Sequence, residues 1–164
     1  AIWAPKEEMG DPHLFCLGLT RVLEQSYGVS LRFGTAVRRL VTGARPAALL
    51  ASGERLEADA LLLCTGAEAR DLLRPLGLDV PVMPVRGHSL TLPPGPEAPR
   101  VSLTDTARKL VFCHLAGTIR LAGQADVGVA NRKVEQRRIA ALMEAARESL
   151  PGAAAWDRPL SAWA

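Results

Sequence analysis

The chain is poor in aromatic residues and has no dense basic stripe, and both features argue against a nucleic-acid-binding protein. Aromatic side chains make up 4% of the 164 residues, and the formal net charge is only +3. Proteins that bind nucleic acids combine clustered Lys and Arg with aromatic platforms for the bases. The basic pairs Arg132-Lys133 and Arg137-Arg138 lie on or beside an expected helix, whose solvated face they form. We therefore expect no nucleic-acid partner.

The common metal and phosphate motifs are also missing. The sequence contains no CxxC pair, no GxGxxG or Walker-type loop and no HExxH. Its three histidines are separated without ligand spacing, which predicts that no metal is bound. Cys16, Cys64 and Cys113 lie far apart in apolar surroundings, which predicts buried free thiols and a cytoplasmic protein. No apolar run approaches the roughly 18 residues of a membrane span, so no transmembrane segment is expected.

The most informative segment that is present runs from residue 58 to residue 67. Its apolar centre, Leu61-Leu62-Leu63-Cys64, predicts a short strand covered on both faces, as in a parallel sheet. Ligands of open α/β sheets bind beyond the carboxyl ends of such strands, which is where Thr65 and Gly66 follow. Thr offers a hydroxyl and Gly lets a ligand approach the backbone closely. A buried strand with a simple glycine turn is the alternative.

The remaining pattern predicts a mixed α/β fold that contains two kinds of sheet. Apolar periodicity and capping residues predict three helices, over residues 11–27, 67–76 and 131–150, the last capped by Asn131. Extended segments are expected at residues 29–41, 47–51, 58–65 and 82–92, near Val101, and at residues 109–115 and 118–122. The first half of the chain resembles α/β architecture and the second half an antiparallel sheet, which indicates parts of a two-domain protein.

Arg86-Gly87-His88 interrupts an otherwise apolar extended segment. The triplet places a cation and an imidazole on either side of a glycine, which makes Arg86 and His88 candidate site residues. The structural alternative is a β-bulge that re-aims the strand.

Taken in chain order, these motifs resemble the FAD-dependent D-amino-acid oxidase superfamily. Within it, the small subunit of bacterial D-amino-acid dehydrogenases is the most similar group. The resemblance covers nearly the whole chain and rests on Gly10-Asp11-Pro12, Gly28-Val29, Thr35-Ala36-Val37, Leu63-Cys64-Thr65-Gly66-Ala67, Pro84-Val85-Arg86-Gly87-His88, Ile119-Arg120-Leu121-Ala122-Gly123 and Ala162-Trp163-Ala164.

This resemblance implies a fragment of an FAD-binding domain interleaved with an antiparallel substrate domain. Residues 1–9 would end a segment of the substrate domain, residues 10–80 would belong to the FAD-binding domain, and residues 81–164 to the substrate domain. The position of Val37 implies a backbone contact with the adenine part of FAD. The positions of Cys64, Thr65 and Gly66 imply contacts with the same cofactor, and Arg86 and His88 would lie toward the substrate side.

The departures from the family pattern bear on activity. The glycine-rich strand-turn-helix that holds the pyrophosphate of FAD is absent from these residues. The family's carboxylate-binding arginine and several flavin contacts fall in segments that do not match this chain. We therefore expect an internal fragment that binds FAD weakly, is inactive in isolation and exposes apolar edges, through which it can self-associate.

For the parent protein, the resemblance implies oxidative deamination of a D-amino acid by hydride transfer to the flavin. Electrons would pass to a quinone or to oxygen, and the protein would be cytoplasmic or peripheral to the inner membrane. Two alternatives stay open. One is a related flavoenzyme that oxidises glycine, sarcosine or a 2-hydroxy acid, and the other is a non-catalytic binding or assembly module with this architecture.

Overall fold

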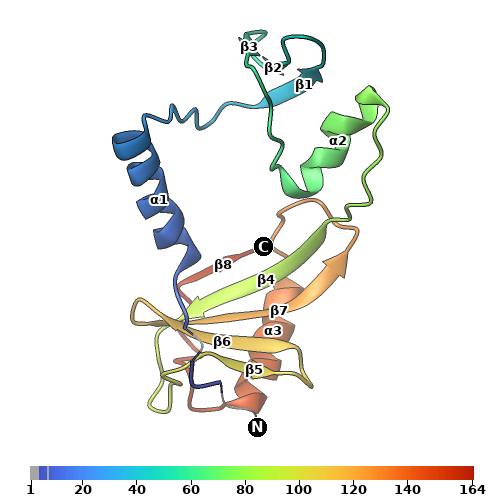
Figure 1. Ribbon diagram of the computed structural model, residues 1–164. Helices are drawn as coiled ribbons and strands as arrows, with labels where there is room; N and C mark the ends of the chain where they lie inside the picture. The colour runs from blue at the N-terminus through green and yellow to red at the C-terminus, as the bar shows by residue number, and fades with distance from the viewer. Residues whose placement is uncertain (1–3, 7) are drawn as a thin grey trace. The chain divides into compact units, whose positions relative to one another are not determined.

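The computed structural model describes residues 4–6 and 8–164, which divide into two compact units. Unit 1 comprises the chain up to Gly18 together with residues 85–164, and unit 2 comprises residues 19–84. Both units contain an antiparallel sheet and helical segments, so the predicted mixed α/β class is confirmed (Figure 1). The assignment of residues 10–80 to a cofactor domain, and of residues 1–9 and 81–164 to a substrate domain, stays a prediction.

Helix α1 (Pro12–Tyr27) follows the predicted start and end signals. The Asp11 carboxylate accepts hydrogen bonds from the backbone N–H groups of His13 and Leu14, at 2.8 and 3.3 Å. Gly28 follows the helix with a φ of 64°, a conformation that glycine adopts without steric cost. None of the side chains of α1 is buried, and Phe15 is 68% exposed.

Unit 2 contains a three-stranded antiparallel sheet and a short helical segment. Strands β1 (Val37–Val41), β2 (Ala47–Leu50) and β3 (Arg55–Glu57) follow one another in the sheet in chain order. The helical segment consists of η1 (Gly66–Glu68), α2 (Ala69–Leu73) and η2 (Arg74–Leu76), and α2 contacts β1. The predicted helix over residues 67–76 is therefore present, although it is divided between α-helical and 3₁₀ geometry.

The buried strand expected around Leu61 is not formed. Residues 58–65 adopt no regular secondary structure, and Leu61 and Leu62 are 41% and 90% exposed. A strand of a parallel sheet needs hydrogen-bonding neighbours and covering helices, and no strand of the described part of the chain pairs with this segment. The apolar sequence is present without the partners that would bury it. The predicted strand over residues 29–36 is likewise absent, since β1 begins only at Val37.

Unit 1 is built on a five-stranded antiparallel sheet with the order β5-β6-β7-β4-β8 (Figure 1). Its strands are β4 (Val85–Leu92), β5 (Leu103–Asp105), β6 (Leu110–Leu115), β7 (Thr118–Val127) and β8 (Ser161–Trp163). The prediction of an antiparallel second half is confirmed. Strand β8 was not expected from its short sequence, and it gains its conformation by pairing with residues 89–91 of β4.

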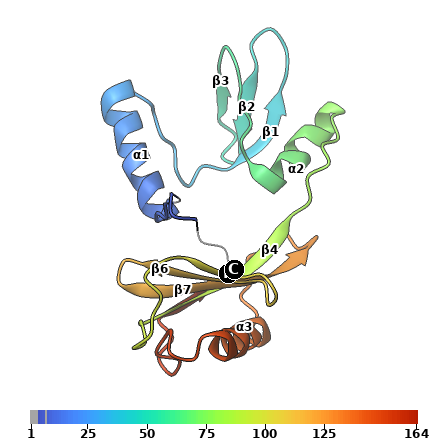
Figure 2. The same cartoon turned by 60° about the horizontal axis from the view of Figure 1, so that its bottom comes forward.

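Helix α3 (Gln136–Ser149) covers one face of this sheet, as Figure 2 shows. Its buried side chains, Ile139, Leu142 and Ala146, meet the apolar residues that alternate along the strands. The sheet contributes Leu90, Leu92, Leu110, Phe112, Ile119 and Leu121 to this core. The apolar stripe predicted for the last helix is therefore the core-facing side of α3.

Asn131 does not cap α3, contrary to the prediction. The helix begins at Gln136 with Glu135 at its N-cap position. The Asn131 side-chain oxygen accepts a hydrogen bond from the Lys133 backbone N–H at 3.0 Å and so closes a turn before the helix. The prediction failed because an Asx-turn and a helix cap carry the same local signal.

The cysteines are free, as expected, but they are not buried. Cys16 and Cys64 are exposed and Cys113 is partly buried. Cys16 lies on a helix that buries no side chain, and Cys64 lies in the segment that does not form a strand. Among the described residues, no helix is long and apolar enough to cross a membrane.

Leu142→Ala should destabilise unit 1 by about 2–5 kcal/mol, because it removes a fully buried side chain and leaves a cavity between α3 and the sheet. Urea denaturation followed by circular dichroism measures this loss. The control is Leu160→Ala, whose side chain is 59% exposed and whose loss should stay within about 0.5 kcal/mol. Equal losses for the two variants would contradict the described packing of α3.

Asp105 links the β5–β6 turn to the end of α3, and its loss should flatten the acid dependence of stability. The carboxylate accepts hydrogen bonds from the Arg108 backbone N–H and the Ser149 hydroxyl, which lower its pKa from 3.8 to about 2. A lowered pKa stabilises the fold above pH 3.8, and this contribution disappears as the pH falls toward 2. Asp105→Asn should therefore lose less stability over that range than the wild type. Asp157→Asn, at an exposed position, should behave as the wild type.

Candidate functional site

Thr65 and Gly66 begin the helical segment of unit 2, where the backbone is open to a ligand. Gly66 has a φ of 56°, and apart from its chain neighbours and the adjacent helix backbone no described atom lies within 4 Å of the position that a Cβ would take. Thr65 occupies the N-cap position of η1, and its side chain makes no capping hydrogen bond. Within the described chain, residues 59–66 donate no backbone hydrogen bond to another backbone group. Their N–H groups and the Thr65 hydroxyl are therefore available donors.

Val37 and Cys64 lie in the same unit as Thr65 and Gly66. Val37 is the first residue of β1, is 39% exposed and pairs with Leu50 of β2. Cys64 is exposed immediately before Thr65. Because α2 follows η1 directly and contacts β1, the two candidate segments are parts of one small arrangement of β1 and α2 (Figure 1).

The exposed groups at these four positions are suited to bind the polar atoms of a cofactor such as FAD. Exposed backbone N–H groups and a free hydroxyl bind phosphate, ribose or ring oxygens, and a glycine without a Cβ allows close approach. The glycine-rich phosphate loop of dinucleotide-binding proteins does not occur in the sequence, so the pyrophosphate-binding part of such a site is missing from these residues.

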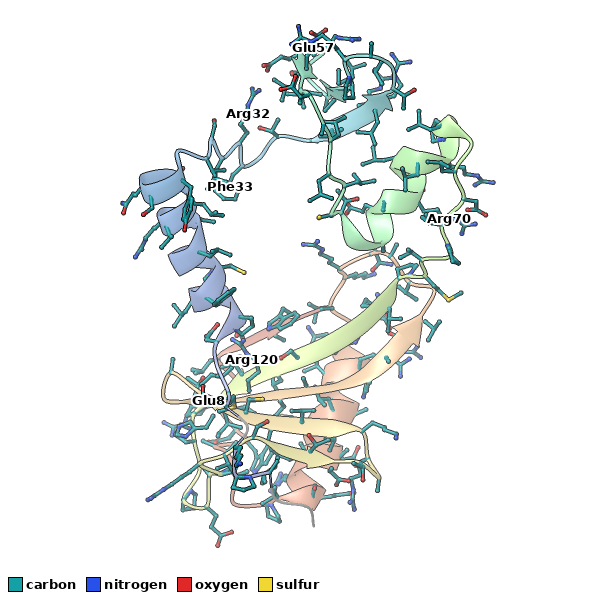
Figure 3. All side chains as sticks on the ribbon, in the orientation of Figure 1. Glu8, Arg32, Phe33, Glu57, Arg70 and Arg120 are labelled. Carbon is teal, nitrogen blue, oxygen red and sulfur yellow. The ribbon has the colours of Figure 1, made fainter. Side chains whose placement is uncertain are left out.

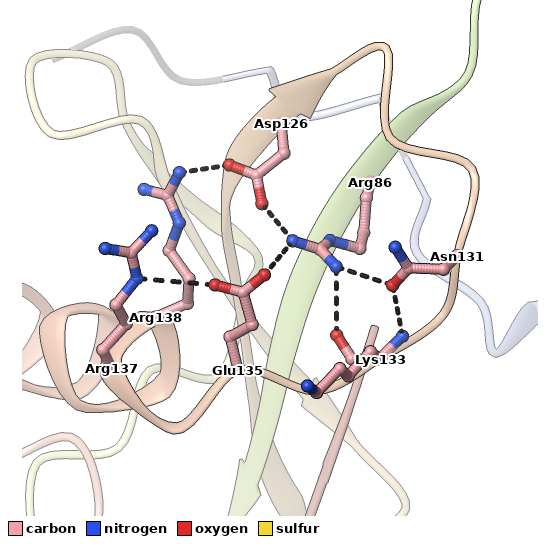
Figure 4. Close-up of polar contacts among 7 residues, drawn as sticks. All are labelled: Arg86, Asp126, Asn131, Lys133, Glu135, Arg137 and Arg138. Atoms are coloured by element: carbon pink, nitrogen blue, oxygen red, sulfur yellow. Dashed lines mark hydrogen bonds and ion pairs between the residues drawn. The ribbon is translucent and has the colours of Figure 1, made fainter.

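Arg86 lies in unit 1, buried within a cluster of charged groups (Figure 4). Its Nη2 donates hydrogen bonds to Asp126 at 3.0 Å and Glu135 at 2.5 Å. Its Nη1 donates to the side-chain oxygen of Asn131 at 2.8 Å and to the Lys133 carbonyl at 3.3 Å. The guanidinium therefore joins β4 to β7, to the following loop and to the start of α3.

The Arg86 guanidinium also controls the charge state of its two carboxylate partners. Its hydrogen bonds lower the pKa of Asp126 and of Glu135, against the opposing effect of burial. Arg138 forms a second ion pair with Asp126, and Arg137 pairs with Glu135 from the solvent side. Each carboxylate of the cluster thus pairs with two cations, and the buried Arg86 pairs with two carboxylates, as a buried ion requires.

His88 lies on the same face of β4 as Arg86, on the side that α3 covers. It is 1% exposed, and neither ring nitrogen has a hydrogen-bond partner among the described residues. The register of β4 against β7 shifts between Arg86 and His88, where β7 carries one extra residue and Gln124 has a φ of 62°. The predicted β-bulge is therefore present at the triplet, although the extra residue is on the partner strand.

The face of the sheet away from α3 carries polar residues that the sequence analysis did not single out as site residues. Thr91 of β4 lies directly opposite Arg120 of β7, and both point away from the core formed by Leu90 and Leu121. Strand alternation was the signal that could have identified them. Alternation along each strand places Thr91 and Arg120 on the face opposite to their apolar neighbours. Only the register of β4 against β7 shows that the two residues lie opposite each other.

Comparison with known proteins assigns the family. The family model described as "FAD dependent oxidoreductase" matches residues 1–164. The chain is 35% identical to "D-amino acid dehydrogenase 2" of Ralstonia nicotianae over 160 residues, which cover 93% of this chain and 38% of that protein. It is 34% identical to "D-amino acid dehydrogenase 2" of Pseudomonas aeruginosa over 166 residues, which cover 99% of this chain and 39% of that protein.

The fold is similar to those of other solved proteins. Glycine oxidase from Geobacillus kaustophilus aligns with a TM-score of 0.68 and 18% identity, over 84% of this chain and 37% of that one. L-amino acid deaminase from Proteus vulgaris aligns with a TM-score of 0.61 and 19% identity. The chain thus spans less than two-fifths of the length of these relatives, and over that span it belongs to the FAD-dependent oxidoreductase family.

Proposed function

We propose that this chain is part of an FAD-dependent enzyme that oxidises D-amino acids to keto acids and ammonia. The observation that carries the proposal is the identity of 34–35% to D-amino acid dehydrogenases over nearly the whole chain. Membership of an FAD-dependent family supports FAD as the cofactor of the enzyme. The cytoplasm is the proposed location, because the three cysteines are free thiols.

The proposed cofactor contacts are Val37, Cys64, Thr65 and Gly66. FAD, when bound, accepts the two electrons that leave the substrate. The protein residues bind and orient: Thr65 would donate its hydroxyl hydrogen bond, Gly66 would allow close backbone approach, and Val37 would offer backbone groups at the edge of the β1–β2 pair. Because the glycine-rich phosphate loop is missing from these residues, we propose that the 164-residue chain alone holds FAD weakly and is inactive.

Arg86 and His88 enter this proposal as residues that support the substrate side of the enzyme. Both side chains lie on the α3-covered face of β4, and Arg86 uses four hydrogen bonds to join β4, β7 and α3. By these bonds Arg86 holds the backbone of β4 in place, and therefore also the side chains on the other face of that strand. The electron acceptor, quinone or oxygen, is left to experiment.

The complete protein that contains these residues should purify with a flavin spectrum that D-alanine bleaches without oxygen, whereas L-alanine should not. Bleaching by glycine or sarcosine in place of D-alanine would support the related flavoenzyme instead. A folded but colourless protein would favour a non-catalytic module and contradict the proposal.

Gly66→Ala should lower FAD retention in the complete protein, because an added Cβ is strained at a φ of 56° and occupies the space of the proposed ligand. The matched control is Gly53→Ala, which has a φ of 90° and equally open surroundings in the β2–β3 turn. The flavin-to-protein absorbance ratio measures retention. Equal ratios in the two variants would remove Gly66 from the proposed site.

Arg86→Met should lower the thermal midpoint of unit 1 more than Arg137→Met does. The first substitution leaves Asp126 buried with a single cation and removes one of the two donors to the Asn131 side-chain oxygen, whereas Arg137 is 82% exposed and makes one bond at 3.4 Å. Thermal unfolding followed by circular dichroism compares them. A smaller effect at Arg86 would show that the cluster does not stabilise the strand.

A further inference from the structure

The outward side of helix α3 carries charges that are not paired within the described chain. Its exposed residues recur at helical spacing on the side opposite the sheet, and we call five of them the exposed stripe: Arg137, Ala140, Ala141, Glu144 and Glu148. Glu144 and Glu148 lie about one turn apart, and neither forms an ion pair with any described residue. Two like charges at this spacing repel each other, so a cation from outside would stabilise them.

The order of the charges along the exposed stripe opposes the dipole of the helix. Negative side chains stabilise the N-terminal end of a helix, and positive side chains stabilise its C-terminal end. The exposed stripe instead has Arg137 in the first turn and Glu144 and Glu148 in the last two turns. Among the charged exposed side chains of α3, only Arg147 follows the favourable order. The exposed stripe therefore weakens the isolated helix, and a neighbour of opposite polarity would offset this cost.

A second copy of α3 that lies antiparallel has the required polarity. When a two-fold axis passes through the middle of the exposed stripe, between its two alanines, Arg137 of each helix lies beside Glu144 of the other. The same register brings Lys133, which is exposed just before the helix, to the level of Glu148. The alanines lie at the crossing point, where small side chains let two helices approach closely. The exposed stripe is thus complementary to itself, as a two-fold contact requires.

A hollow beside the exposed stripe has the composition that an arginine side chain needs. Met143, Pro151 and Trp156 line it together with Glu144. Arginine has an aliphatic stem and a guanidinium, which pack on apolar and aromatic surfaces and pair with a carboxylate. The hollow offers both kinds of contact beside Glu144, where the antiparallel register places Arg137 of the second copy.

We propose that two copies of the complete protein form a dimer in which their exposed stripes pack antiparallel. The contact is independent of the proposed oxidation reaction, because none of its residues belongs to the proposed FAD contacts. Helix α3 has 14 residues and is about 21 Å long, so the contact is smaller than a standard protein interface. The dimer is therefore weak, with a Kd on the order of 10 µM at low salt.

Sedimentation equilibrium of the complete protein measures this Kd, which should rise between about 50 mM and about 500 mM NaCl because the ion pairs are exposed. Glu144→Arg and Arg137→Glu should each raise Kd by about 10-fold or more, since each replaces two attractive pairs of the symmetric dimer by two repulsive ones. The double variant Arg137→Glu/Glu144→Arg restores opposite charges in the same register. Its Kd should return to within about 3-fold of the wild-type value.

The matched control is Glu8→Arg, which makes the same change of charge at an exposed residue of unit 1 that precedes α1 and is labelled in Figure 3. It should change Kd by less than about 2-fold. A native circular dichroism spectrum shows that each variant folds.

A wild-type protein that stays monomeric up to about 1 mM would overturn the proposal. A dimer that both single variants leave unchanged would overturn it as well, because the contact would then lie on another surface. Single variants that weaken the dimer without recovery in the double variant would contradict the antiparallel register.

Discussion

The pairing of β4 with β7 is the constraint on which unit 1 depends. It is the longest ladder of the described sheet, and its register decides which side chains meet α3 and which lie on the other face. Leu90 and Leu92 meet Leu121 and Ile119 on the helix side, while Thr91 and Arg120 meet on the far side. A slip of one residue would exchange the two sets and expose the core.

The Arg86 cluster closes one end of this pairing. Between Arg86 and His88 the ladder contains a bulge, which weakens the backbone pairing of β4 with β7. Arg86 spans the irregularity and bonds Asp126 of β7 and Glu135 at the start of α3, so the helix and the two strands share one set of ion pairs. The same contacts hold β4 in place and so fix the positions of the polar residues on its other face.

In unit 2, an apolar segment stays exposed because it has no strand partner in the described chain. Its residues 59–66 combine an apolar run with backbone N–H groups that donate to no other backbone group, because no strand of the described chain pairs with them. The proposed FAD contacts at Thr65 and Gly66 and the exposed Leu62 therefore have one physical origin. The backbone N–H groups and the apolar side chains of this segment have no partners within the described chain. A cofactor can use the N–H groups as hydrogen-bond donors.

The sequence by itself determined the family, the mixed α/β class and most helices and antiparallel strands. Local signals carry these features, as in the Asp11 cap, the α3 apolar stripe and the alternation of Leu90 and Leu92. Only the tertiary structure decided the exposure of Leu62 and Cys64, the pairing of β8 and the partners of Arg86. It also brought Thr91 opposite Arg120. These features depend on residues distant in the chain, and burial, register and ion pairing are properties of such contacts that no local pattern contains.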